Sequence, residues 1–211
     1  MGELEYPYSI LIYLKGNVMK KVLLSLMFVV SMLFAGSDSA KVNKYYKDLY
    51  KLNDEQIYNM MFSYAMGNKN GNDLGLTLAA IAWKESLFGK YTINLADGKH
   101  GSFSMYQIHL DYAATRNNIK TIWAKSRLAE SLLKDKAFAA EEAIAILKYF
   151  MNRNGCNWRC AVASYNAGFS GLKSKEGKAY VHDISLRIKA LDRKFKNLNL
   201  YEKLNSLEVD M

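Results

Sequence analysis

The chain has 211 residues, the size of one ordinary domain, and half of them are hydrophobic, which is enough to build a core. Proline occurs once while alanine, leucine, lysine and methionine are frequent, a balance that favours helices over a β-sandwich or a barrel. The formal charge of +9 suits an anionic partner such as a cell wall or a membrane surface, but no arginine-rich run, zinc pattern or aromatic sheet motif supports a nucleic-acid-binding module.

The N-terminal part has the order of segments that is typical of a secretory signal peptide. Met19-Lys20-Lys21 is a short basic start, Val22 to Ala35 is an apolar run of 14 residues, and small residues follow up to Ala40. The apolar run is shorter than the ~20 residues that span a bilayer. We therefore expect residues 1–18 to be an upstream extension or tag, residues 19–37 to be a signal peptide, and the mature protein to be periplasmic. An uncleaved membrane anchor is the alternative.

The first half of the mature chain predicts helices separated by polar loops. Residues 41–52 indicate a short polar helix or an ordered arm. Asn53, with acids after it and Gln56 three residues on, is typical of a helix cap, and we expect this helix to stop at Gly67. After a loop over 67–72, Asp73 is expected to cap a second helix that carries apolar residues at helical spacing and ends at Gly89.

The second half continues in the same way, so the predicted fold is mainly α. Residues 89–101 indicate a loop, and a small irregular β excursion is expected around 90–108, where 103–110 fits a strand and a helix equally. The remaining helices are predicted at 111–118, 122–133, 139–152, 158–167 and from about 179, with a loop over 168–177. One domain is expected over 41–200, followed by a tail at 201–211.

The two cysteines, Cys156 and Cys160, lie four positions apart. Export would permit a disulfide, although so small a loop needs a turn or a helix end to satisfy disulfide geometry. Neither a CxxC redox motif nor a second cluster for zinc is present. We predict a local structural disulfide, with a free buried pair as the alternative.

Glu85 is the one charged residue on the apolar stripe of the helix after Asp73. Burial disfavours an ionised carboxylate, so the pKa of this side chain should rise. A raised carboxyl pKa is what a general acid needs near neutral pH. The alternative is a glutamate that reaches solvent or pairs with a lysine, but Lys84 is expected to point elsewhere.

Four short motifs follow one another along the chain. They are Glu85-Ser86 at a helix end, Gly101-Ser102-Phe103-Ser104-Met105-Tyr106-Gln107-Ile108, Ala161-Val162-Ala163-Ser164-Tyr165-Asn166-Ala167-Gly168, and Tyr180-Val181. Each motif alone is weak, but the ordered set resembles the lytic transglycosylases of the soluble (SLT-domain), lysozyme-like family, over about residues 74–185. The resemblance implies a single helical domain of the goose-type lysozyme kind.

The resemblance also implies roles for individual residues. Glu85 would be the single catalytic acid/base, and the hydroxyl of Tyr165 would support it. The expected contacts to substrate come from Ser86, Met105, Gln107, Asn166 and Tyr180, and Tyr180 also resembles the late tyrosine that lies near the carboxylate in the family. For Met105, Tyr165 and Tyr180, packing in the core is the alternative. Two positions depart from the family pattern, because Ser104 stands where glycine is usual and Tyr106 where methionine is common. We expect Ser104 to mark a backbone that accepts a side chain or a slightly altered cleft floor, and Tyr106 to add a face for stacking on sugars.

A mechanism with one carboxylate fits the sequence better than the pair that most glycosidases use. Asp97, the nearest second candidate, lies in an Ala-Asp-Gly sequence typical of a turn. The family resemblance implies cleavage of the bond between N-acetylmuramic acid and N-acetylglucosamine with a 1,6-anhydro product, and it implies no metal or organic cofactor. The expected partner is therefore the peptidoglycan glycan strand, and a protein of a secretion system or of the cell-wall machinery is a further candidate partner.

Three other functions are left open. A hydrolytic lysozyme on the same fold would use Asp97 as a base for water. A catalytically weak wall-binding or assembly protein of a secretion system would lack the acid. A nucleic-acid or membrane-surface module would rely on the basic last helix, and we expect no nucleic acid partner and no membrane contact beyond the signal or an uncleaved anchor.

Overall fold

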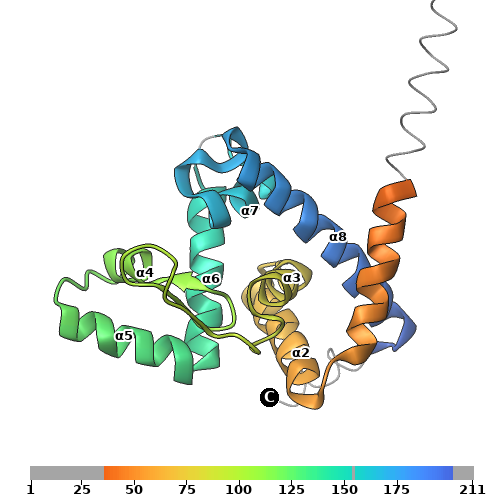
Figure 1. The fold of residues 1–211 in the computed structure, drawn as a ribbon, viewed down its shortest axis with the longest axis horizontal. Coiled ribbons are helices and arrows are strands. Elements are labelled where there is room, and N and C mark those ends of the chain that lie inside the picture. The colour runs from red at the N-terminus through yellow and green to blue at the C-terminus, as the bar shows by residue number, and fades with distance from the viewer. Residues whose placement is uncertain (1–35, 154, 202–211) are drawn as a thin grey trace, which may run out of the picture. The chain divides into compact units, whose positions relative to one another are not determined.

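The computed structural model describes residues 36–153 and 155–201, which form two units that are treated separately (Figure 1). The predicted extension at 1–18, nearly all of the predicted signal peptide, and residues 202–211 of the tail lie outside these ranges. In the first unit, residues 36–43 are helical, and the helix runs on to residue 48 in the second unit. Among the described residues, no helix combines the length and the apolar character needed to cross a membrane.

The second unit is mainly helical, as the sequence predicts. Helix α2 (Asp54–Asn68) begins with the predicted capping box, in which the Asn53 side chain accepts from the Gln56 N–H and the Gln56 side chain accepts from the Asn53 N–H. The predicted stop at Gly67 is wrong, because the helix passes through this residue. A Cβ there would lie 2.7 Å from Gly75 Cα, so Gly67 instead permits the close approach of the next helix.

Helix α3 (Gly75–Ser86) lies at the centre of the helical packing and carries Glu85 in its last turn. Nine of its twelve residues are buried, and it packs against α2, α6 and α8, so it is covered on more than the one face that its periodicity indicates (Figure 1). The predicted cap at Asp73 is wrong: Leu74 precedes the helix without a side-chain cap, and Asp73 has a positive φ of 52°.

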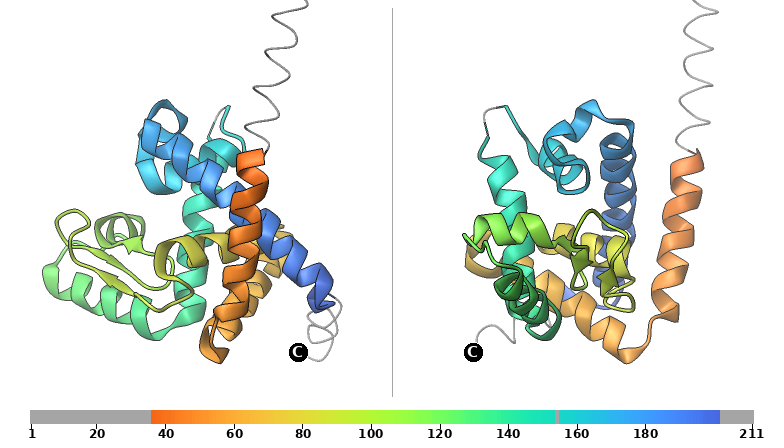
Figure 2. Two further views of the ribbon diagram at one scale, coloured as in Figure 1. Left: turned by 45° about the vertical axis from the view of Figure 1, so that its right-hand side comes forward. Right: turned by 60° about the vertical axis from the view of Figure 1, so that its left-hand side comes forward.

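The predicted β excursion is a small antiparallel sheet between the helices (Figure 2). It has the order β1 (Ile93–Asn94), β2 (Ser102–Phe103) and β3 (Ile108–His109), with Phe103 paired to Ile93 on one side and to Ile108 on the other. The segment 103–110, which fits a strand and a helix equally by sequence, is therefore the end of one strand, a tight turn, a second strand and the start of a helix. This turn brings the second motif up to the end of α3.

The second half of the unit is helical, and two helix starts differ from the prediction. The helices are α4 (Leu110–Arg116), α5 (Ile122–Lys134), α6 (Lys136–Met151), α7 (Trp158–Ala167) and α8 (Lys175–Asn197). Asp135 caps α6, accepting from the Phe138 N–H at 2.9 Å, so this helix begins before residue 139. Ser174 caps α8, accepting from the Gly177 N–H at 2.8 Å. The predicted loop over 168–177 is therefore a 3-10 turn (Gly168–Lys173) and the first turn of α8.

The turn between β2 and β3 keeps the backbone shape that suits glycine. Ser104 has a φ of 76° and Gln107 a φ of 49°, both in the left-handed region that side chains disfavour. The Ser104 hydroxyl accepts from the Tyr106 N–H at 3.2 Å. The expectation that Ser104 marks a backbone suited to a side chain is therefore wrong, because the backbone keeps the left-handed conformation that favours glycine and the serine adopts it.

We predict that Ser104→Gly raises the free energy of unfolding by about 0.5–1 kcal/mol, because relief of the left-handed strain exceeds the loss of one weak hydrogen bond and the added freedom of the unfolded chain. Urea denaturation of the two proteins would measure the change. Ser104→Ala is the control: it keeps the strain, loses the hydrogen bond and should be less stable than the wild type. A glycine variant less stable than the wild type would show that the hydroxyl contact dominates.

Candidate active site

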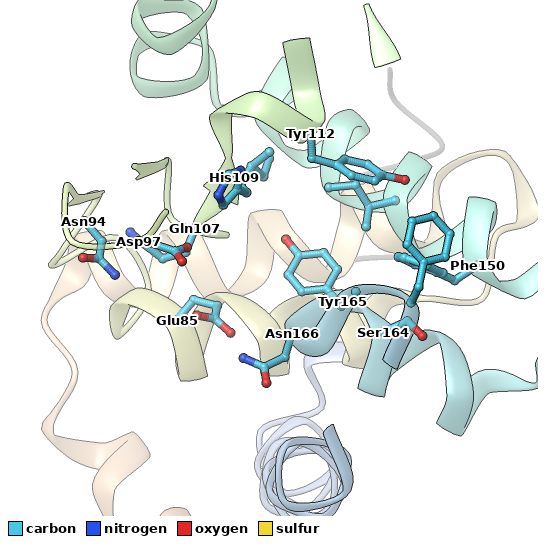
Figure 3. A pocket seen from close by; sticks show the side chains of 14 residues that line it. Glu85, Asn94, Asp97, Gln107, His109, Tyr112, Phe150, Ser164, Tyr165 and Asn166 are labelled. Atoms are coloured by element: carbon cyan, nitrogen blue, oxygen red, sulfur yellow. The ribbon is translucent and has the colours of Figure 1, made fainter. Parts of the chain in front are cut away.

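A cleft of about 380 Å³ lies between the end of α3, the small sheet and helices α4, α6 and α7 (Figure 3). It brings together residues that are far apart in the sequence, and Glu85 and Asn166 lie at one edge of it while His109 and Tyr112 lie at the opposite edge. Its lining residues are Glu85, Asn94, Asp97, Gln107, Ile108, His109, Tyr112, Ile146, Phe150, Ser164, Tyr165, Asn166, Gly168 and Phe169.

Glu85 is half-buried where it lines this cleft, and its surroundings favour the protonated form. Burial is the largest influence and raises the pKa of the carboxyl above its ordinary value. The nearby charge of Asp97 acts in the same direction, whereas the hydrogen bond from Tyr180 and the charges of Lys84 and Arg187 lower the pKa. The net result is a raised pKa, which keeps Glu85 able to donate a proton at a higher pH than an exposed glutamate can.

The hydroxyl that supports Glu85 comes from Tyr180 and not from Tyr165. The Tyr180 hydroxyl donates to Glu85 Oε1, while the Tyr165 hydroxyl donates to the Tyr106 carbonyl oxygen at 2.9 Å. Burial raises the pKa of both phenols well above the ordinary value, so both remain protonated donors. The expectation that Tyr180 lies near the carboxylate is confirmed. Tyr180 is buried and does not line the cleft, which corrects its expected role as a substrate contact, and Tyr165 lines the cleft without bonding the acid.

Ser86 was expected in the sugar cleft, but the structure places it inside the protein, 1% exposed. Its hydroxyl donates to the Met105 carbonyl oxygen at 2.7 Å, lies 3.0 Å from the Ala82 carbonyl oxygen and accepts from the Gly89 N–H at 2.7 Å. One hydroxyl thus joins the end of α3 to the turn of the second motif. Ser86 holds the frame of the cleft and does not face a substrate.

Met105 is likewise buried and does not line the cleft with Glu85. Its side chain faces a separate cavity on the other side of the turn, bordered by α2, α5 and α6, and its sulfur accepts from the Ser63 hydroxyl at 3.9 Å. The expected contact between Met105 and substrate is therefore not seen, and the alternative of core packing fits this residue.

Gln107 and Asn166 do line the cleft. The Gln107 Nε2 donates to the Tyr91 carbonyl oxygen at 2.9 Å and lies 3.2 Å from the Ser104 carbonyl oxygen, which orients the amide. Its Oε1 is buried and has no hydrogen-bond partner among the described residues. Asn166 is exposed at the edge of the cleft. Asn166 therefore has polar groups available to a bound molecule, whereas the Gln107 amide lines the cleft with its nitrogen engaged and its oxygen enclosed.

Sequence reasoning missed the aromatic side of the cleft. Tyr112 stacks on Phe150 with ring centroids 6.5 Å apart, and Phe150 meets Phe169 edge to face at 5.9 Å. Phe169 is 68% exposed, and the Arg153 guanidinium lies 4.6 Å from the centre of its ring. No motif signals these positions, because their side chains converge only through the packing of α4, α6 and the turn after α7. Flat apolar faces of this kind are suited to stacking on sugar rings.

Asp97 lines the same cleft, and its carboxylate accepts from the buried Ser102 hydroxyl. The contact fits the structural duty expected of an Ala-Asp-Gly turn, since it ties the loop before β2 to the sheet. Asp97 nevertheless faces the space in front of Glu85, so it stays the second carboxylate of the site.

The cysteines form a local link beside this cleft. Cys156 and Cys160 are joined by a disulfide with Cα atoms 5.2 Å apart, and Cys160 lies in the first turn of α7, which is the helix-end setting that so small a loop requires. In residues 36–153 and 155–201, no group of three or more His, Cys, Asp or Glu side chains is arranged to hold a metal ion.

A mainly helical domain with a half-buried glutamate at the end of its central helix, beside a small antiparallel sheet, defines a lysozyme-like protein. Residues 66–188 match the Transglycosylase SLT domain, and the chain belongs to this family.

The chain is also similar to two kinds of curated protein. It is 27% identical over 203 residues to an uncharacterized 20.7 kDa protein in the vs-regB intergenic region of Enterobacteria phage T4, a match that covers 89% of this chain and 99% of the phage protein. It is 33% identical over 110 residues to Protein IpgF of Shigella sonnei and of Shigella flexneri, covering 52% of this chain and 68% of theirs. No solved structure matches the chain.

We predict that Ser86→Ala lowers the free energy of unfolding by about 1–3 kcal/mol, because it removes the partner of the buried Met105 carbonyl and of the part-buried Gly89 N–H. Ser126→Ala is the matched control, since the Ser126 hydroxyl also bonds a helix carbonyl, that of Ile122 at 3.1 Å, but is exposed. It should change the unfolding free energy by less than about 0.5 kcal/mol. Equal effects of the two substitutions in urea denaturation would contradict the role given to Ser86.

We predict that Glu85→Gln stabilises the protein relative to the wild type at pH 8 but not at pH 4. The pKa of Glu85 is higher in the folded than in the unfolded wild type, where it is about 4.3. The protonated carboxyl therefore contributes its full stability to the folded state below pH 4.3. This contribution is lost as the pH rises through the folded-state pKa, because the half-buried carboxyl must then ionise. Gln keeps an oxygen that can accept from Tyr180 and does not ionise. Denaturation at both pH values measures the difference, and a constant gap between the proteins would refute the raised pKa.

Proposed function

We propose that the protein is a peptidoglycan lytic transglycosylase that cleaves the β-1,4 bond between N-acetylmuramic acid and N-acetylglucosamine, with Glu85 as its single acid/base. The observation that carries this proposal is the setting of Glu85, whose raised pKa, donated hydrogen bond from Tyr180 and place in the cleft are those of a general acid. Membership of the Transglycosylase SLT domain family supports the substrate class.

In the proposed reaction, Glu85 first protonates the glycosidic oxygen, and the bond to C1 of the muramoyl sugar breaks with its electron pair on the leaving sugar. The acetamido group of the substrate stabilises the developing cation, as in other substrate-assisted glycosidases. The ionised Glu85, stabilised by the hydroxyl of Tyr180, then accepts the proton of the C6 hydroxyl, whose oxygen attacks C1. The product is a 1,6-anhydro sugar and no water is consumed.

The remaining cleft residues would hold the glycan strand. Gln107, which lines the cleft, and the exposed amide of Asn166 at its edge contact the strand. The exposed ring of Phe169 and the part-exposed ring of Tyr112 offer apolar surface to sugar rings, with the buried Phe150 packed against both. Tyr165 orients the turn by its bond to the Tyr106 carbonyl and so maintains the position of this surface. A periplasmic enzyme, made with a signal peptide at 19–37 and a domain at 41–200, suits this substrate.

A second candidate function is a hydrolytic lysozyme, favoured by one observation. Asp97 lines the same cleft as Glu85, and its Ser102 contact holds the carboxylate in place. A fixed second carboxylate that activates water is the arrangement of inverting glycosidases. The product would then carry a reducing end in place of the anhydro ring.

Digestion of insoluble peptidoglycan tests both candidates and gives a further prediction. The protein from residue 38 onward should release muropeptides with anhydro ends, as weighed by mass spectrometry, and Glu85→Gln should release about 10²-fold less or none, the order of loss expected when a general acid is removed. Glu130→Gln is the control, because Glu130 is an exposed acid paired with Lys134 on α5, away from the cleft, and it should be fully active.

Products one water heavier, with reducing ends, would refute the transglycosylase and favour the lysozyme. Asp97→Asn would then be expected to abolish activity. Binding to the wall by wild type and variant alike, without any released product, would leave a wall-binding or assembly role and refute the catalytic one.

A further inference from the structure

Asp183 is a buried carboxylate on α8 that the reaction described above does not use. This residue is 7% exposed, and its carboxylate accepts from the Tyr45 hydroxyl and from the Arg187 Nε at 3.1 Å, while the Lys84 Nζ lies 3.3 Å away. Cations beside a buried carboxylate offset the cost of burying its charge. Asp183 does not line the cleft, so any influence on the reaction has to pass through its partners.

Those partners lead directly to Glu85. Lys84 precedes Glu85 in the last turn of α3, and Asp183 follows Tyr180 by three residues, which places both on one face of α8. Two neighbouring contacts therefore connect the end of α3 with α8. One is the hydrogen bond from Tyr180 to Glu85, and the other is the salt bridge between Lys84 and Asp183. The Arg187 guanidinium is held close by, 4.4 Å from the centre of the Tyr45 ring and 4.7 Å from that of Trp83.

The charges around Glu85 explain why this arrangement matters for a proton donor. The ionisable groups that act on it are Lys84 on α3, Tyr180 and Arg187 on α8, Asp97 in the loop before β2, and Tyr165 on α7. Burial and Asp97 raise the pKa of Glu85, whereas the two cations lower it. Without a counter-charge, the charges of Lys84 and Arg187 would favour the ionised form of Glu85 and so oppose proton donation by this carboxyl.

We propose that Asp183 is a positioning residue for Glu85: by pairing with Lys84 and Arg187 it holds these cations and offsets their charge, so that Glu85 stays protonated and in reach of Tyr180. The charge effect and the geometric effect have the same origin, because the carboxylate that neutralises the cations also fixes the register between α3 and α8. The inference rests on the proposed function only in taking Glu85 as the acid.

The test is the pKa of Glu85, measured by NMR titration of protein labelled with ¹³C at the glutamate carboxyl carbons. The signal of Glu85 is identified by its absence from Glu85→Gln. In Asp183→Asn, which keeps an oxygen for the Tyr45 hydroxyl but removes the charge, the pKa of Glu85 should fall by about one unit. The alkaline limb of the pH profile of kcat/KM on glycan strands should move down by the same amount.

Asp192→Asn is the matched control. Asp192 lies on the same helix and has the same kind of partners, a cation four residues on (Lys196, 2.7 Å) and a tyrosine hydroxyl (Tyr201, 2.7 Å), but it is far along α8 from Tyr180. Its removal should leave the pKa of Glu85 unchanged. An unchanged or raised pKa of Glu85 in Asp183→Asn, or an equal fall in Asp192→Asn, would overturn the proposal.

Lys84→Gln provides a second route if Asp183→Asn does not fold. Removal of one cation from the cluster should raise the pKa of Glu85, and in the double variant with Asp183→Asn the fall should be largely reversed. No effect of Lys84→Gln would also overturn the proposal, because the cluster would then be uncoupled from the acid. The titration needs no turnover, so an inactive protein whose Glu85 responds as described would refute the proposed function while sustaining this inference.

Discussion

The burial of α3 is the constraint on which the rest of the site depends. Helix α3 packs against α2, α6 and α8, and its last turn places the side chain of Glu85 in the lining of the cleft. The desolvation that raises the pKa of this carboxyl is a direct consequence of that packing. An ionised carboxylate in such a place is costly unless hydrogen-bond donors surround it, and the Tyr180 hydroxyl on α8 is such a donor to Glu85. The nearby cations Lys84 and Arg187 are in turn paired with Asp183.

Several motif residues serve the backbone and not the reacting groups. Ser86 joins the end of α3 to the turn of the second motif, and Tyr165 bonds the carbonyl of Tyr106 in the same turn. The Gln107 Nε2 donates to the Tyr91 carbonyl oxygen, and its buried Oε1 has no hydrogen-bond partner among the described residues. A short sequence motif of this kind therefore encodes the shape of a turn at least as much as a set of contacts to a ligand.

The fold class could be predicted from the sequence, because it rests on local patterns, and so could the half-buried place of Glu85 at the end of an apolar helix. The helical spacing around Glu85, the capping box at Asn53 and the ordered motifs are visible without coordinates. The place of Tyr180 near the carboxylate follows from the family resemblance, whereas the absence of a bond from Tyr165 to Glu85 could not be predicted, since it depends on how α7 packs on the turn between β2 and β3. The role of Gly67 was misread for a related reason: a glycine that permits a close helix contact looks the same in sequence as one that ends a helix. The aromatic wall and Asp183 arise only from tertiary packing and leave no local signal.

The hydrogen bond between Tyr180 and Glu85 joins residues 95 positions apart. The carboxyl and its donor lie on α3 and α8, so the environment of Glu85 depends on the packing of two helices that are distant in the sequence. A contact of such high sequence separation carries a loop-closure cost that the local contacts within a helix do not. A C-terminal truncation that removes α8 would therefore take away the hydrogen-bond donor of Glu85, although it leaves the motif around the glutamate untouched in sequence.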